Sequence, residues 1–409
     1  MTSSPCAQSK KHSPTQTPSF SPEPMPNATK TTLITLALAA LALFSPKNAL
    51  AASLELRVAI EENVSQVRIG SSVNATITDA TTNQTLGEIQ GMNGFTATTG
   101  GRGIALDKYS APKIAINPKD PNGVVWIGDR WYRGRTIITP TSGGLTAINY
   151  VDLESYLYSV LGGEMNGNWP QEALKAQAVA ARSYALFRRN RDGNSSSDLC
   201  DTARCQVYRG VQDESTGTQT AVNATAGQVL TYNGTIIEAL FHSSSGGHTE
   251  NVEDVWGTRV PYLRAVQDYD QNAPVYSWNK IISRNELGNI VGLGPITAVN
   301  PVGKPTAGGS YRQLEFISGS TKKRVTTENL RDSLNLRSAK ITIVPQTITT
   351  KSNTKDQTAT SFVIQGKGFG HGLGMSQYGA KGMAEQGLNY QQIALHFFQN
   401  TKLAKIDPR

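Results

Sequence analysis

The pattern of hydrophobic and polar positions divides the chain into a strand-rich part and a mixed part. Between Leu54 and Tyr150, short runs that alternate apolar and polar residues are separated by Gly, Asn and Pro clusters. This pattern is typical of β-strands joined by turns. The Gly- and Thr-rich stretch from Ile89 to Arg102 lacks periodicity, so a loop, weakly paired strands and a hairpin are all open there.

From residue 153 onwards the spacing of apolar residues changes to that of a helix. Residues 153–161 carry an apolar stripe, and the Ala-rich run from Pro170 to Arg189 predicts a long helix with proline in its first turn. Strands at 227–232, 236–242, 340–344 and 362–365 and helices at 328–336, 376–386 and 390–399 follow, with a linker or long loop at 301–309. This mixture predicts an α+β fold.

The N-terminal 51 residues predict an exported protein. Residues 1–29 are rich in Ser, Pro and Thr, a composition typical of disorder. Lys30 then introduces a mostly apolar run at 31–44, and the small-residue pattern Ala49-Leu50-Ala51 follows. We expect a secretory signal peptide cleaved near Ala51. A short buried helix is the alternative, and retention as an anchor also stays open.

Composition narrows the class of protein without naming its function. The chain has 409 residues, of which 38% are hydrophobic and 17% charged, so it can bury a large core. Lysine and arginine outnumber aspartate and glutamate by 39 to 31, which suits an acidic polymer or an anionic surface. Three cysteines exclude a disulfide-rich miniprotein and a four-cysteine zinc module.

Glu164 is the candidate catalytic residue. It follows two glycines and lies between an apolar helix and a turn that contains Trp169, where it can lose part of its hydration. Desolvation raises the pKa of a carboxyl group, and a protonated glutamate is the general acid that glycosidic cleavage requires. From these residues alone, an ordinary surface glutamate in a turn is the alternative.

Four stretches carry a family resemblance. Residues 156–165 (YLYSVLGGEM) and 169–185 (WPQEALKAQAVAARSYA) resemble the signature of the stage II sporulation protein D family, which includes the amidase enhancer. Residues 241–250 (FHSSSGGHTE), followed by Val255-Trp256 and Pro261-Tyr262-Leu263, and residues 368–380 (GFGHGLGMSQYGA) agree with it in order. The resemblance spans residues 120–400, roughly, and its motifs are long enough to be specific.

The resemblance implies a peptidoglycan lytic transglycosylase. Such an enzyme cleaves the bond between N-acetylmuramic acid (MurNAc) and N-acetylglucosamine (GlcNAc) and leaves a 1,6-anhydro end. Glu164 matches the catalytic acid and base of the family, and one carboxyl suffices, unlike in two-carboxylate hydrolases. The implied fold is α+β, a β-rich secreted domain whose long Ala-rich helix borders the active-site cleft.

Further residues are expected to bind the substrate. Arg182 matches an arginine expected to line the cleft, where it would hold an acetyl or lactyl group or tune Glu164; a salt bridge on the helix surface is the alternative. Tyr262 could instead be a core residue that does not contact substrate. The glycines beside His371 could instead serve only to let the backbone pack closely. A serine nucleophile in the serine run would lack a recognisable nucleophile elbow. The full set of binding candidates is Arg182, Gln177, His242, Ser243, Ser244, Ser245, Thr249, Tyr262, His371 and Gln377.

Cys200 and Cys205 are expected to pair with each other. The resemblance raises a zinc site here, because some family members are set up to hold zinc with nearby histidine, but Arg204 stands where a further histidine would be expected. In an exported protein a disulfide that closes this short loop is favoured over a structural zinc or free thiols. Neither a catalytic metal nor a required cofactor is expected.

The resemblance also sets the expected domains and partners. Residues 1–51 would be the N-region and signal peptide, 52–119 a β-rich N-terminal segment, 120–400 the catalytic domain and 401–409 a tail. We expect glycan strands and a cell-wall amidase as partners, and no nucleic acid; the sequence does not address the oligomeric state. The main rival function is a non-catalytic wall-binding enhancer of an N-acetylmuramoyl-L-alanine amidase, and a general carbohydrate-binding module is a third.

Overall fold

The computed structural model describes residues 54–101, 103–191, 196–346 and 360–406. The signal peptide expected at residues 1–51 lies outside this part of the chain. Within the described residues, no helix combines the length and the apolar character that crossing a membrane requires.

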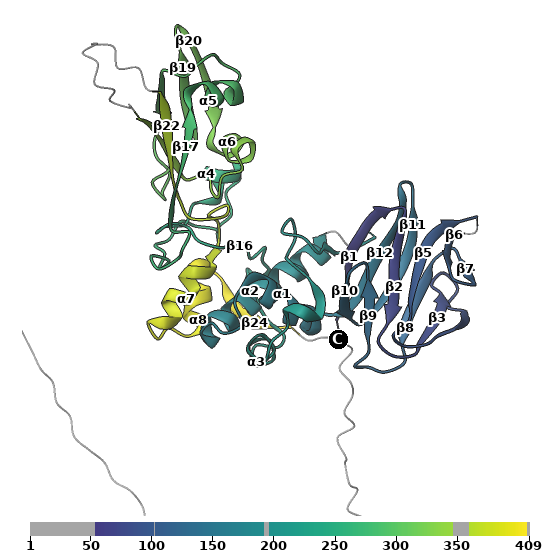
Figure 1. Cartoon of the computed structure of the whole chain (residues 1–409). Coiled ribbons are helices and arrows are strands. Elements are labelled where there is room, and N and C mark those ends of the chain that lie inside the picture. The colour runs from purple at the N-terminus through teal and green to yellow at the C-terminus, as the bar shows by residue number, and fades with distance from the viewer. Residues whose placement is uncertain (1–53, 102, 192–195, 347–359, 407–409) are drawn as a thin grey trace, which may run out of the picture. The chain divides into compact units, whose positions relative to one another are not determined.

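The first hundred residues of this part form a β-sandwich of two antiparallel sheets (Figure 1). One sheet has the order β13-β1-β12-β11-β8-β3-β4 and the other the order β10-β9-β2-β5-β6-β7, and only the short β13 (Leu199–Cys200) pairs in parallel. The strands are β1 (Glu55–Val64), β2 (Gln66–Ser71), β3 (Ala75–Asp79), β4 (Thr85–Ile89), β5 (Gly94–Gly100), β6 (Gly103–Leu106), β7 (Tyr109–Ala111), β8 (Ile114–Pro118), β9 (Val124–Ile127), β10 (Arg130–Arg133), β11 (Arg135–Thr141) and β12 (Gly144–Asp152). The β-rich prediction is therefore confirmed, and the stretch left open at 89–102 contains β5, which pairs with β2 and β6.

The boundary expected after residue 119 falls inside this sandwich. Before it, β8 pairs with β11, and after it, β9 pairs with β2. Strands from both sides of residue 119 therefore complete the same two sheets. A segment that ended at residue 119 would expose unpaired strand edges and part of the core.

A helical layer follows the sandwich and shares its hydrophobic core. Helix α1 (Leu153–Glu164) is capped by Asp152, whose carboxylate accepts the backbone N–H groups of Glu154 and Ser155 at 3.1 Å. Helix α2 (Gln171–Arg191) is buried from Ala173 to Leu186 except at Lys175, because small alanine side chains allow neighbouring elements to pack around it. The predicted long Ala-rich helix is confirmed, and with it the α+β class.

The remaining elements of this layer are short. They include a parallel pair of strands, β16 with β23, that joins two distant parts of the chain. In chain order they are η1 (Gly210–Asp213), α3 (Thr216–Ala224), β14 (Gln228–Tyr232), β15 (Thr235–Ile236), β16 (Phe241–His242), α4 (Val252–Trp256), β23 (Met375–Ser376), α7 (Gln377–Glu385), α8 (Tyr390–Phe397) and β24 (Lys402–Lys405).

Residues 402–405, which the sequence assigned to a tail, form β24. This strand pairs with β14, so that Ala404 lies opposite Val229. Leu403 and Ala404 pack against the main core, which gives this end of the chain a fixed place.

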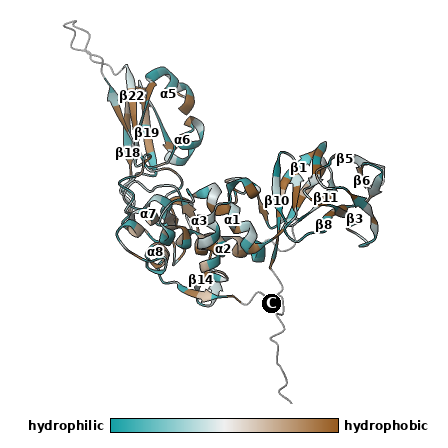
Figure 2. Cartoon of the chain, turned by 60° about the horizontal axis from the view of Figure 1, so that its bottom comes forward, coloured by the Kyte–Doolittle hydropathy of each residue, from teal (hydrophilic) through white to brown (hydrophobic). Residues whose placement is uncertain are grey.

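A second hydrophobic core lies in the inserted unit, which we define as residues 277–367. Two three-stranded sheets, β17-β22-β21 and β18-β19-β20, enclose it together with two helices. Figure 2 shows apolar residues on the strands here as well as on those of the sandwich. The elements are β17 (Ser277–Ser283), α5 (Arg284–Val291), β18 (Ala298–Val302), β19 (Gln313–Ser318), β20 (Thr321–Thr326), α6 (Thr327–Leu334), β21 (Ile341–Gln346) and β22 (Ser361–Lys367).

Candidate active site

Glu164 is the last residue of α1, and both of its carboxylate oxygens accept a hydrogen bond. The backbone N–H of Val207 donates to Oε1 and the side-chain amide of Gln377 donates to Oε2, each at 3.0 Å. Gln377 is the first residue of α7 and lies 213 positions further along the chain. One donor lies in the loop after the Cys200–Cys205 segment and the other on α7, and together they fix the plane of the carboxyl group.

The two glycines before Glu164 allow other backbone segments to approach the end of α1. A Cβ atom on Gly162 would lie 1.7 Å from the carbonyl oxygen of Asp213, and one on Gly163 would lie 2.9 Å from that of Val207. Any other residue at Gly162 would therefore push η1 away from the helix. This close packing brings the N–H of Val207 to Glu164.

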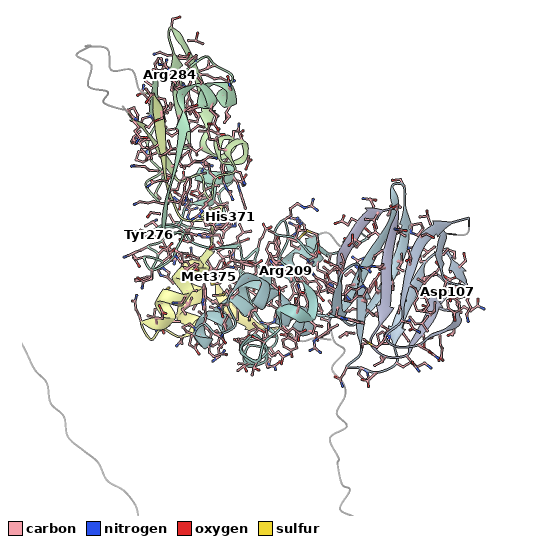
Figure 3. All side chains as sticks on the ribbon, in the orientation of Figure 1. Asp107, Arg209, Tyr276, Arg284, His371 and Met375 are labelled. Atoms are coloured by element: carbon pink, nitrogen blue, oxygen red, sulfur yellow. A yellow bond between two sulfur atoms is a disulfide. The ribbon has the colours of Figure 1, made fainter. Side chains whose placement is uncertain are left out.

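Burial raises the pKa of Glu164 above its usual value of 4.5, because desolvation outweighs the hydrogen bonds from Val207 and Gln377 and the charge of Arg209. The position of Glu164 at the C-terminus of α1 acts in the same direction, since the negative end of a helix disfavours a carboxylate. The guanidinium group of Arg209, labelled in Figure 3, also forms an ion pair with Asp213, with 3.7 Å between nitrogen and carboxylate oxygen. The site therefore favours a protonated Glu164 more than water does.

Glu164 lines a cleft with a volume of about 490 Å³. Of the residues predicted from the sequence, His242, Ser243, His371 and Gln377 line it together with Glu164, and Cys205 lies at its wall. They come from β16, α7 and the loops beside them. The structure thus brings together residues of three sequence motifs around one carboxyl group.

Arg182 does not line this cleft. Its side chain is fully buried, and its guanidinium group binds both carboxylate oxygens of Glu154, at 2.6 and 2.9 Å. It also donates to the backbone carbonyl of Gln228 at 3.0 Å. Arg182 therefore ties α1, α2 and β14 together, and its buried guanidinium is held by the partly exposed Glu154 rather than facing the cleft.

Ser244 and Ser245 are also engaged in the interior. Their hydroxyl groups donate to Asp270 and Asp268, each at 2.5 Å, and both serines are buried. Burial, with the nearby charge of Asp270 as the second cause, raises the pKa of Asp268 to about 6. These two serines hold the loop in place, and Ser243 is the one of the three that lines the cleft.

Three further candidates lie away from the cleft. Thr249 is fully buried, and its hydroxyl accepts the N–H of Val266 at 2.8 Å. Tyr262 is half-buried against the core, and its hydroxyl accepts the N–H of Glu238 at 3.4 Å. Gln177 is fully buried on α2, and its side-chain amide has no hydrogen-bond partner among the described residues.

The two histidines form part of the cleft wall, with ring centroids 5.3 Å apart. Nδ1 of His242 lies 3.0 Å from the carbonyl oxygen of Leu373, and Nδ1 of His371 accepts the N–H of the same residue at 3.0 Å. Desolvation lowers the pKa of His242 well below 6.5 and that of His371, labelled in Figure 3, to about 4. Both rings are therefore neutral near neutral pH.

Sequence reasoning missed two exposed aromatic residues at the cleft. Trp256 is 54% exposed and Phe369 is 46% exposed, and both line the cleft near His371. Exposed rings beside a polar cleft are suited to stacking against sugar rings. Both residues lie in the motifs quoted above, but a motif does not distinguish an exposed ring from one in the core. Charged residues that were also missed in this wall are Arg188, Arg204, Glu238 and Arg331.

Cys200 and Cys205 form a disulfide, as expected, with their Cα atoms 5.5 Å apart. The bond closes the loop that precedes Val207, the residue whose N–H holds Glu164. In the part of the chain that the structure describes, no group of three or more His, Cys, Asp or Glu side chains is placed to hold a metal ion.

Comparison with known proteins identifies the family. A family model described as "Stage II sporulation protein" matches residues 141–232, which include α1, α2 and Glu164. The stage II sporulation protein D of Bacillus subtilis is 33% identical over 281 residues, which cover 64% of this chain and 77% of that protein. The chain belongs to the stage II sporulation protein D family.

Two further relatives are similar to this chain over most of its length. An uncharacterized protein of Brachyspira hyodysenteriae is 32% identical over 301 residues, which cover 73% of this chain and 78% of that protein. The amidase enhancer of Bacillus subtilis is 31% identical over 295 residues, covering 60% of this chain but only 40% of that protein. The family resemblance seen in the sequence motifs is confirmed.

Proposed function

We propose that this chain is a peptidoglycan lytic transglycosylase in which Glu164 serves first as the general acid and then as the general base. The observation that supports this proposal is the state of the Glu164 carboxyl group. It lies at the wall of a cleft, burial raises its pKa, and two neutral donors fix its orientation. A general acid requires this combination of a retained proton and a fixed direction.

The reaction needs one carboxyl group and no water. Protonated Glu164 gives its proton to the glycosidic oxygen as the bond between that oxygen and C1 of MurNAc breaks, so GlcNAc leaves with a free hydroxyl. The C6 hydroxyl of the same MurNAc then attacks C1, and the Glu164 carboxylate takes its proton. The products are a 1,6-anhydro end and a regenerated Glu164.

The hydrogen bonds to Glu164 suit both halves of this cycle. Val207 and Gln377 donate to the carboxylate, so they stabilise the charged form that exists between the two proton transfers. In the proposed complex, Trp256 and Phe369 would stack against sugar rings on the cleft wall. The neutral histidines would offer hydrogen bonds to sugar hydroxyls without adding charge.

A substrate in the cell wall requires export. The Cys200–Cys205 disulfide is of the kind that persists outside the reducing cytoplasm, and relatives are named for sporulation and for enhancing an amidase. We therefore also propose that residues 1–51 direct the chain out of the cytoplasm and that cleavage occurs near Ala51.

The second candidate function is a wall-binding enhancer of an amidase. It is favoured by the similarity to the amidase enhancer of Bacillus subtilis. Such a protein would bind the same glycan strands and leave them intact, while a separate amidase works faster in its presence.

The test is incubation of the purified chain with intact and peptide-free glycan strands, followed by mass spectrometry. We expect 1,6-anhydromuramyl ends with the unmodified chain and none with Glu164→Gln. Glu238→Gln serves as the second variant, because Glu238 is another carboxyl at the cleft wall. Ordinary reducing ends that disappear in both variants would replace the proposal with two-carboxylate hydrolysis. Binding without any cleavage, together with faster hydrolysis by an added amidase, would favour the enhancer.

A further inference from the structure

Two buried carboxyl groups, Asp268 and Asp270, lie beside the serine loop, which we define as residues 243–247. Their side chains are 0% and 1% exposed, and neither lines the active-site cleft. The proposed reaction gives them no role. A buried carboxyl group is costly unless hydrogen bonds satisfy it, so the partners of each aspartate show what it holds in place.

The side chain of Asp270 is bound to the serine loop. Its carboxylate accepts the hydroxyl of Ser244 at 2.5 Å and the backbone N–H groups of Gly246 and Gly247 at 2.7 and 2.9 Å. All three donors belong to one short segment. Asp270 therefore fixes the shape of this loop.

Asp268 instead joins the serine loop to the start of α7. Its Oδ2 atom accepts the hydroxyl of Ser245 at 2.5 Å, and its carboxylate is also hydrogen-bonded to Ser376. Ser376 is the N-cap of α7, and its hydroxyl accepts the N–H of Gly379 at 3.1 Å. One carboxylate thus connects two segments that are distant in the sequence.

Two glycines of α7 allow the segment that contains Asp268 to lie against this helix. A Cβ atom on Gly379 would lie 1.7 Å from Oδ1 of Asp268, and one on Gly382 would lie 2.0 Å from the carbonyl oxygen of Tyr269. The two glycines are three positions apart and share a face of the helix. The carboxylate of Asp268 therefore rests on the first turn of α7, where the helix dipole favours a negative charge.

This first turn carries the contact with Glu164. Gln377 directly follows Ser376, and its amide donates to Oε2 of Glu164 at 3.0 Å. The N–H of the next residue, Tyr378, donates to the carbonyl oxygen of Ser243 at 3.0 Å. A displacement of the turn would lengthen or misalign the hydrogen bond to Glu164, and such bonds weaken steeply when their geometry worsens.

We propose that Asp268 is a positioning residue for Glu164, because it fixes the first turn of α7 and so keeps the amide of Gln377 on Oε2. The inference deepens the proposed function and rests on it only in giving the proton of Glu164 a catalytic role. Asp270 holds the serine loop by its own hydrogen bonds, so the two aspartates form a matched pair for a test.

Positioning and charge predict opposite effects on the pKa of Glu164. Loss of the hydrogen bond from Gln377 removes a donor to the carboxylate, so the pKa of Glu164 should rise. Loss of a negative charge acting through space would lower that pKa. The titratable or charged groups that face the two carboxyls are Asp270 and Lys340 for Asp268, and Arg209 and Tyr156 for Glu164.

The experiment titrates Glu164 directly, by carbon NMR of the chain isotope-labelled at its glutamate carboxyl carbons, with Glu164→Gln to assign the signal. Asp268→Ala should raise the pKa of Glu164 by about 0.5–1 unit, the effect of losing one neutral hydrogen bond. Asp270→Ala, the matched control, removes the neighbouring buried carboxyl and should leave this pKa unchanged. In a Gln377→Ala background, Asp268→Ala should add no further shift, because its effect passes through that amide.

Ser376→Ala keeps the test decisive if Asp268→Ala does not fold. It breaks the same link at the α7 end and should give the same upward shift. An unchanged or lowered pKa of Glu164 in the folded variant would overturn the proposal. So would equal shifts in the Asp268 and Asp270 variants, or a full further shift where Gln377 is already alanine.

The titration uses no substrate, so its result is independent of the reaction. An upward shift in a chain that forms no anhydro ends would refute the transglycosylase and retain the positioning role of Asp268. Anhydro ends without the shift would do the reverse.

Discussion

The two ends of helix α1 each carry a glutamate, and the structure uses them in different ways. Glu154, in the first turn, binds the buried guanidinium of Arg182 through both oxygens and accepts the N–H of Gly227 at 3.1 Å. Glu164, the last residue, receives hydrogen bonds from neutral donors and, among the described residues, forms no ion pair. The helix dipole favours a carboxylate at the first position and disfavours it at the second.

This difference shows how partners give one residue type two roles. Both oxygens of Glu154 are bound by the guanidinium of Arg182 and one also by the N–H of Gly227, so Glu154 acts as an anchor. Glu164 has only neutral hydrogen-bond donors, and its burial raises its pKa above the usual value, which favours a retained proton. The anchor also serves the site, because it fixes α1 against α2 and β14 and thereby places Glu164.

The most direct test of the difference between Glu154 and Glu164 is a substitution at Glu164. Glu164→Gln should lower the rate of anhydro-end formation by about 10³-fold, since general acid–base catalysis contributes on the order of 10²–10⁴. The variant should stay folded, because glutamine accepts one of the two hydrogen bonds and Gln377 can rotate its amide to satisfy the other. Glu385→Gln, on the exposed part of α7, is the matched control. Cleavage rates and a thermal melt give the answer, and a cleaving Glu164→Gln chain would remove Glu164 from the mechanism.

Breaking the anchor should instead affect stability. Arg182→Met removes the buried cation and leaves Glu154 without its counter-ion, which should reduce the free energy of unfolding by about 3–5 kcal/mol. Urea unfolding measures this value. The control is Arg324→Met in the exposed pair with Glu315, which should cost about 0–1 kcal/mol. Equal losses in the two variants would mean that burial gives the Glu154 pair no special weight.

The pH dependence of activity tests the role of the neutral hydrogen-bond donors to Glu164. Activity should fall as pH rises through the raised pKa of Glu164, because the acid step needs the proton. Gln377→Ala removes a hydrogen bond that lowers this pKa, so the alkaline limb of the kcat profile should move to higher pH, and kcat should drop about tenfold at its optimum. A profile that stays in place or moves to lower pH would contradict this role of Gln377.

The same pKa predicts a dependence of stability on pH. Because the pKa of Glu164 is higher in the folded chain than the unfolded value of 4.5, ionisation of this residue opposes folding. The penalty is absent below pH 4.5 and grows as pH rises through the folded-state pKa. Glu164→Gln should therefore be more stable than the unmodified chain at neutral pH and equal to it in acid. Urea midpoints at two pH values test the sign, and a variant that loses stability only at neutral pH would contradict it.

The smallest effect is expected at the disulfide. Replacing Cys200 and Cys205 by alanine opens a loop with a sequence separation of 5, which should cost about 2 kcal/mol of folding free energy. Activity should fall only a few fold, since Val207 remains on its own backbone beside α1. Reduction of the unmodified chain is the matched control and should shift the melting temperature in the same direction. A complete loss of cleavage would mean that the loop positions Glu164 more strictly than its hydrogen bond suggests.

Local patterns in the sequence determined the strands of residues 54–150, the Ala-rich helix and Glu164 itself. Alternation, alanine content and a long motif are properties of neighbouring residues, so they can be read without knowing the fold. The motif also led to the family, which the relatives confirmed.

Tertiary structure alone decided which side chains reach the cleft. Arg182 and Gln177 lie on a helix that is buried on nearly all sides, so helical spacing does not show which face meets the substrate. Trp256 and Phe369 are exposed, while Ser244 and Ser245 are held by Asp270 and Asp268 more than twenty positions away. The contact between Glu164 and Gln377 joins residues 213 positions apart. The burial of a side chain and its hydrogen-bond partners depend on segments that meet only in the folded chain. For that physical reason the sequence identified the carboxyl group of Glu164, whereas only the fold showed its burial, its partners and its raised pKa.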